Sequence, residues 1–84
     1  MERFLVYVSD QQKETVAGVR KRGKTLVIEP GLFAMEAPIG GEELTEVIRR
    51  IVPKGSNFFV AKIALIGGDG DGAFLKVMKR LAPR

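Results

Sequence analysis

Residues 57–72 read NFFVAKIALIGGDGDG, an apolar run that leads directly into a loop of alternating glycine and aspartate. Residues 58–66 have the pattern of a strand: one face carries only apolar side chains, and Lys62 alone interrupts the other. A strand that is apolar on both faces is typical of the interior of a sheet. This stretch therefore predicts a strand that needs cover on both sides.

Outward from this stretch, the sequence predicts three further strands and three helices. The strands are expected at residues 3–9, 25–29 and 32–37, and the helices at residues 11–22, 42–52 and 73–81. The turn signal Pro30-Gly31 makes the second and third strands antiparallel neighbours. The first six elements follow the β-α-β-β-α-β order of a ferredoxin-like α+β sandwich, to which the last element adds a C-terminal helix.

Right-handed crossovers would place the first and third strands in the centre of the sheet and both early helices on one face. The strand at residues 58–66 then lies at an edge, where an apolar strand invites association unless something covers it. We expect the C-terminal helix or a second subunit to provide that cover. The 84 residues suffice for a single domain with a small core, and a homodimer is one common way to stabilise such a core.

The composition limits the chemistry. The chain has neither cysteine nor histidine, so any metal would be held by oxygen, as magnesium is. No apolar run reaches the roughly 18–20 residues of a membrane span, and the first residues lack the features of a signal peptide. We therefore expect a cytoplasmic protein with no membrane partner. The absence of cysteine and tryptophan and the 29% of charged residues would also suit a thermophile.

The 14 basic and 10 acidic residues give a formal net charge of +4. Four of the basic residues form a cluster, here called the basic cluster: Arg20, Lys21, Arg22 and Lys24. Such a cluster is either a solvated surface or a surface that binds phosphates. Nucleic acid is therefore a candidate partner, and these four residues are candidate contacts.

Asp10 ends the first expected strand, immediately before a helix. One interpretation is an N-cap, since Ser9 and Gln12 fit a capping box that would begin the helix at Ser9 or Asp10. The other is a magnesium ligand and catalytic carboxylate, which would need its copy across a dimer axis or the phosphates of a substrate. The residues alone leave both interpretations open, and with them the question of enzymatic activity.

The loop at residues 67–72 matches the dinucleotide fingerprint only nominally, because too few residues follow it to complete a βαβ unit. Its GGDG sequence also resembles the nucleotide-binding loop of lipid and NAD kinases, which are far larger proteins. The simplest interpretation is a flexible turn between a strand and a helix.

Residues 6–10, VYVSD, resemble the shorter motif of RNA-recognition modules, with Tyr7 at the position that stacks on a base. The longer motif of that family would fall in the strand at residues 32–37. Leucine and alanine stand there where two aromatic residues belong. Tyr7 is therefore the aromatic candidate for nucleic-acid binding.

Residues 3–65 also resemble the small dimeric CRISPR-associated ferredoxin-like proteins, which form the central adaptor of spacer integration and include metal-dependent nucleases. The resemblance rests on a first strand that ends in Asp10, followed by a basic helix, a β-hairpin, a second helix and another strand. It implies that two subunits share a metal ion through Asp10. It also implies that basic residues such as Arg20 and Arg22 face nucleic-acid phosphates.

Two functions follow as hypotheses. The first is a small basic nucleic-acid-associated domain, with a homodimeric magnesium-dependent nuclease or a CRISPR adaptation-type protein as its narrower form. The alternative is a non-catalytic interaction or regulatory module that oligomerises through its sheet edge or its open sheet face.

Overall fold

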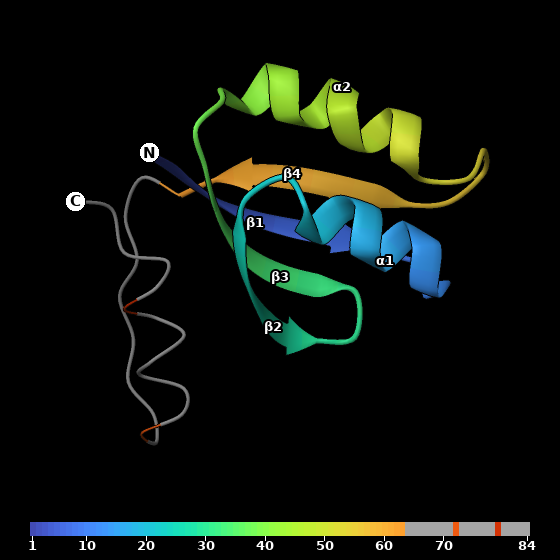
Figure 1. The fold of residues 1–84 in the computed structure, drawn as a ribbon, viewed down its shortest axis with the longest axis horizontal. Helices are drawn as coiled ribbons and strands as arrows, with labels where there is room; N and C mark the ends of the chain where they lie inside the picture. Colours follow the sequence, from blue (N-terminus) through green and yellow to red (C-terminus); the bar gives the residue numbers. More distant parts are fainter. Residues whose placement is uncertain (64–71, 73–78, 80–84) are drawn as a thin grey trace.

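The computed structural model describes residues 1–63 and, beyond them, Gly72 and Lys79. In this part of the chain four strands form one sheet, and two helices lie on one of its faces (Figure 1). The strands are β1 Glu2–Val8, β2 Lys24–Glu29, β3 Leu32–Ala37 and β4 Phe58–Lys62, and the helices are α1 Lys13–Arg20 and α2 Gly41–Ile51. The expected α+β class is borne out.

The strands are arranged in the order β2-β3-β1-β4, and every neighbouring pair is antiparallel. β1 and β3 are therefore central, as the sequence indicated, and β4 is an edge strand of the described sheet. Val6 lies between Phe33 of β3 and Val60 of β4, whereas Tyr7 lies between Leu32 and Phe59. This register brings the end of β1 beside the start of β4.

The core lies between the sheet and the two helices. Alternate residues of β1 face the helices and are fully buried, as the sequence pattern predicted. The core residues of all elements are Phe4, Val6, Val8, Val19, Phe33, Met35, Ala37, Leu44 and Ile48. Burial of each large apolar side chain contributes about 1.5–3 kcal/mol, so this cluster is the main source of stability in the described part.

The start of α1 differs from its prediction. The N-cap is Gln12, whose side chain makes no capping hydrogen bond, so the expected cap at Ser9 or Asp10 is wrong. Ser9 is instead tied to the residue before β4: its amide donates to the Asn57 carbonyl at 2.8 Å, and its hydroxyl accepts from the Asn57 amide at 2.9 Å. These two bonds extend the β1–β4 pairing, which delays the helix by several residues.

Gly18 lies where α1 meets α2. A Cβ atom added at this position would lie 3.0 Å from Cγ2 of Ile51, closer than carbon atoms normally approach. The glycine costs the helix up to about 1 kcal/mol relative to alanine, and in return the two helices approach closely. Its presence inside a helix is therefore explained by packing.

Several expectations lie outside the described residues. These are the extension of the last strand through residues 64–66, the glycine–aspartate loop apart from Gly72, and the helix at residues 73–81 apart from Lys79. The cover that this helix would give β4 therefore stays a prediction. Among the described residues, no helix is long and apolar enough to cross a membrane.

Gly31 and Gly55 offer a matched test of the turns, because both have positive φ, 86° and 90°. A Cβ at Gly31 would overlap the Val8 carbonyl oxygen and the Gln11 side-chain amide, whereas nothing lies within 4 Å of one at Gly55. We expect Gly55→Ala to lower the free energy of unfolding by about 1 kcal/mol and Gly31→Ala by about 2 kcal/mol or more. Urea denaturation measures both, and equal losses would contradict the close contact at Gly31.

Candidate functional site

The basic cluster lies at the turn between α1 and β2, and all four of its side chains are exposed. Arg20 donates from Nε to Oγ1 of Thr25 at 3.1 Å, which ties the end of the helix to the edge strand. Between them, Gly23 lies so close to the Glu36 carbonyl that a Cβ atom would overlap it. The turn thus presents its cations from a fixed backbone.

Tyr7 does not lie near the basic cluster. Lys24 is level with Arg3, since both lie opposite Glu36 of the intervening strand, and Tyr7 is four residues further along β1. Strand geometry then separates Tyr7 from Lys24 by roughly 13 Å along the strands and roughly 10 Å across them. The structure places the predicted stacking residue and the predicted phosphate contacts at opposite ends of the sheet.

Tyr7 has an aromatic neighbour that the sequence analysis missed. Its ring stacks on that of Phe59 in β4, with 5.7 Å between the ring centroids and an interplanar angle of 25°. The two residues, here called the aromatic pair, lie on the sheet face away from the helices, and Phe59 is 45% exposed. The predicted strand order already made β1 and β4 neighbours. The register that pairs Tyr7 with Phe59, however, cannot be read from the sequence.

A second feature lies at the same end of the sheet, where residues 52–57 connect α2 to β4. A cavity of about 320 Å³, here called the α2–β4 hollow, is lined there by Arg49, Val52, Pro53, Lys54, Gly55, Ser56 and Phe58. The Arg49 guanidinium lies over the Phe58 ring in a cation–π contact, with its central carbon 5.5 Å from the ring centroid. Because Phe58 and Phe59 are successive residues of a strand, the α2–β4 hollow and the aromatic pair lie on opposite faces of β4.

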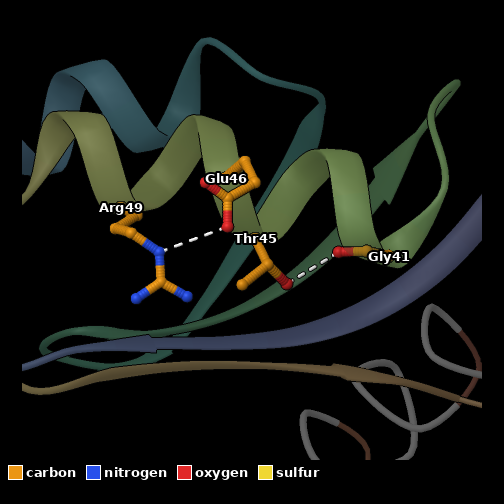
Figure 2. A network of polar contacts seen from close by, with 4 residues as sticks. All are labelled: Gly41, Thr45, Glu46 and Arg49. Atoms are coloured by element: carbon orange, nitrogen blue, oxygen red, sulfur yellow. Dashed lines mark hydrogen bonds and ion pairs between the residues drawn. The ribbon is translucent and has the colours of Figure 1, made fainter.

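Figure 2 shows how α2 presents Arg49. The side chain leaves the helix on the side of the strands, and its Nε donates to Oε1 of Glu46 at 3.3 Å. One turn earlier, the Thr45 hydroxyl donates to the Gly41 carbonyl of the same helix at 2.7 Å. The guanidinium is thus positioned by an acidic partner along the helix and by an aromatic ring beneath it.

Asp10 follows β1 at this same end. Its Oδ2 atom is buried and accepts no hydrogen bond within the described residues. No group of three or more acidic, histidine or cysteine side chains is placed to hold a metal ion in residues 1–63 or at Gly72 and Lys79. The described part of one chain therefore supplies one carboxylate and does not make up a magnesium site, so the metal and catalytic roles of Asp10 stay predictions.

The sequence analysis also missed an ion pair on the sheet face away from the helices. Arg3 of β1 donates to Glu36 of β3 at 2.8 Å, and their side chains are only 10% and 11% exposed. Ala34, two residues from Glu36 on the same face, is fully buried. The centre of this face is therefore not open, and its exposed aromatic surface is the end that carries the aromatic pair.

Comparison of the chain with protein-family models, with curated proteins and with solved structures finds no match in any of the three. The resemblance to CRISPR-associated proteins therefore stays a sequence-based prediction. The function has to be inferred from the chemistry of the described surfaces.

The buried ion pair can be compared with an exposed one. We expect Glu36→Gln to lower the free energy of unfolding by about 3 kcal/mol, because it removes the negative charge that faces Arg3 in a nearly buried setting. Glu46→Gln is the control, since its pair with Arg49 is 59% exposed on both sides and should contribute less than about 1 kcal/mol. Urea denaturation should rank the two losses clearly, and a reversed rank would contradict the burial of Arg3 and Glu36.

Proposed function

We propose that this protein is a nucleic-acid-associated domain that binds single strands where β1 ends and β4 begins. The observation that carries the proposal is the aromatic pair, a stacked tyrosine and phenylalanine of which Phe59 is 45% exposed. Aromatic rings on a sheet surface stack on bases of any sequence, and each such contact is worth about 1–3 kcal/mol. An exposed phenylalanine on an edge strand otherwise increases the risk of aggregation.

The described arrangement supports a ferredoxin-like fold as part of this proposal. The order β2-β3-β1-β4, the antiparallel pairing and the two helices on one face all fit the β-α-β-β-α-β plan. In RNA-recognition modules of this topology, bases stack on aromatic side chains of the face that the helices leave free. Here the aromatic residues lie on β1 and on the edge strand β4, not on the two central strands.

The charges support the proposal independently of the aromatic pair. The chain has a formal net charge of +4, and the basic cluster exposes all four of its cations. Phosphates attract such a surface without regard to sequence, and the attraction weakens as salt rises. The basic cluster therefore contributes long-range attraction, while the aromatic pair contributes contacts to bases.

These two contributions can be separated by mutation. We expect Phe59→Ala to weaken binding of single-stranded DNA or RNA about tenfold with an unchanged salt dependence, because it removes stacking alone. The double variant Arg20→Ala, Arg22→Ala should instead reduce the slope of log affinity against log salt by about 1–2. Fluorescence anisotropy with labelled oligonucleotides at several salt concentrations measures both effects.

The matched control for Phe59→Ala is Val27→Ala, since Val27 is 44% exposed on the opposite edge strand β2. The affinity of Val27→Ala for the oligonucleotides should equal that of the wild type.

The alternative function, a non-catalytic interaction module, makes another prediction. It predicts a concentration-dependent oligomer that Phe59→Ala dissociates, without salt-dependent binding of nucleic acid. If neither DNA nor RNA binds at low salt, the proposal is wrong.

The narrower form of the proposal is a homodimer that shares magnesium through Asp10, as a nuclease or a CRISPR adaptation-type protein would. The buried Oδ2 atom without a hydrogen-bond donor in the described residues favours it, because such an oxygen is suited to a cation. The remaining ligands would have to come from a second copy or from substrate phosphates.

Magnesium tests this form directly. Millimolar magnesium should raise the Tm and the dimer fraction of the wild type, since a ligand that binds only the assembled state stabilises it. Asp10→Asn should abolish both effects, as followed by thermal melting and sedimentation. Magnesium-dependent cleavage that survives Asp10→Asn would exclude the residue from the reaction.

A further inference from the structure

The α2–β4 hollow has groups suited to binding an anion that is attached to a planar ring, such as a phosphate attached to a nucleoside. Arg49 contacts both the Phe58 ring and the Glu46 carboxylate, and this second contact uses only its Nε atom. Within the described residues, its two terminal nitrogens make no hydrogen bond. A guanidinium in this state offers a phosphate two parallel donors, and its outer face offers a base a surface on which to stack.

The turn after α2 brings further groups to the same hollow. The Ser56 amide donates to the Pro53 carbonyl at 3.0 Å, and Gly55 adopts a φ of 90°. This closed turn places the exposed Lys54 in the lining with Arg49, while Val52 and Pro53 supply an apolar wall. The lining thus offers two cations for a phosphate, one hydroxyl for a hydrogen bond and an apolar wall.

The electrostatics of the hollow also favour an anion. None of its seven lining residues is acidic, and Glu46 contacts Arg49 from outside the lining. The end of α2 carries a partial negative charge that opposes an anion, but it is a fraction of one charge, and Arg49 and Arg50 lie in the same last turn. The net effect is attraction, since the two positive charges of the lining, Arg49 and Lys54, exceed the charge of the Glu46 carboxylate and the partial charge of the helix end together.

We propose that the α2–β4 hollow binds a nucleoside monophosphate group, with the phosphate on Arg49 and Lys54 and the base on the outer face of the guanidinium. The volume of about 320 Å³ lies at the lower end of the range for small-molecule sites. The group has two sources, a free mononucleotide or the phosphorylated end of a strand. The second source rests on the function proposed above, whereas the first does not.

The position of the hollow suits the end of a strand. Phe58 and Phe59 direct their rings to opposite faces of β4, which is an edge strand of the described sheet. A strand whose bases stack on the aromatic pair can therefore reach the hollow by passing this edge. The hollow would then recognise the end of the strand that the aromatic pair binds.

The first experiment titrates the protein with adenosine monophosphate, adenosine, ribose 5-phosphate and inorganic phosphate, while NMR follows the backbone amides of Gly55 and Ser56. We expect saturable shifts with adenosine monophosphate. Binding of each of the other three should be at least about tenfold weaker, because each lacks the phosphate, the base or both the base and the sugar.

Variants of Arg49 test the assignment. Arg49→Gln should weaken binding of adenosine monophosphate about tenfold or more. Arg49→Lys should also weaken it, since lysine keeps the positive charge but lacks the planar guanidinium group. Arg50→Gln is the matched control: Arg50 is the exposed neighbour on the same helix and does not line the hollow. It should stay within about twofold of the wild type. Unchanged Tm values should show that the fold is intact.

The second experiment compares single-stranded oligonucleotides with and without a terminal phosphate. A preference for the phosphate that disappears in Arg49→Gln supports the strand end, and binding of adenosine monophosphate without such a preference supports the free mononucleotide. The site is overturned if Arg49→Gln binds adenosine monophosphate as tightly as the wild type, or if Gly55 and Ser56 show no saturable shift. Phe59→Ala separates this outcome from failure of the proposed function. This variant should weaken the binding of oligonucleotides and leave the affinity for adenosine monophosphate unchanged.

Discussion

The pairing of β1 with strands on both of its sides is the constraint on which the rest of the described structure depends. Side chains of a strand alternate between two faces, so one register assigns every residue of β1 to the core or to the opposite face. The observed register sends Phe4, Val6 and Val8 into the core. The same register sets Tyr7 against Phe59 and Arg3 against Glu36. A slip by one residue would exchange the two sets and bury the arginine against the helices.

This register also explains why the aromatic pair, the α2–β4 hollow and Asp10 lie at one end of the sheet. α2 ends, β4 begins and β1 ends at that same end, so Arg49, Phe58, Phe59, Tyr7 and Asp10 are brought there from three segments of the chain. The hydrogen bonds between Ser9 and Asn57 hold two of these segments together beyond the last paired residues. The basic cluster lies at the opposite end because α1 runs back along the sheet before β2 begins. One sheet thus separates a surface suited to ring stacking from a surface suited to charge.

Local patterns in the sequence predicted much of the described fold and little of the site. The alternation in residues 3–9, the Pro30-Gly31 turn and the apolar spacing of α2 gave strands and a helix whose bounds differ from the structure by one residue or so. The start of α1 could not be predicted, because the choice between capping a helix and extending a ladder depends on Asn57, which is 48 residues away from Ser9. Phe59 was missed for the same reason, since its partner is set by register. Arg3 and Glu36 were each visible as a charge within an apolar strand, but only the fold brings them together.

The late position of β4 in the sequence has a consequence for the chain during its synthesis. β1, β2 and β3 can pair as soon as residue 37 is available, but the other edge of β1 waits for Phe58–Lys62. At a ribosomal rate of about 5–20 residues per second, the intervening stretch takes roughly 1–4 s to make. Throughout that interval, the backbone of a central strand has one row of amides and carbonyls without a partner strand. A nascent chain of this protein therefore carries the open edge of β1 before the strand that completes it exists, and neighbouring nascent chains on the same message carry the identical edge.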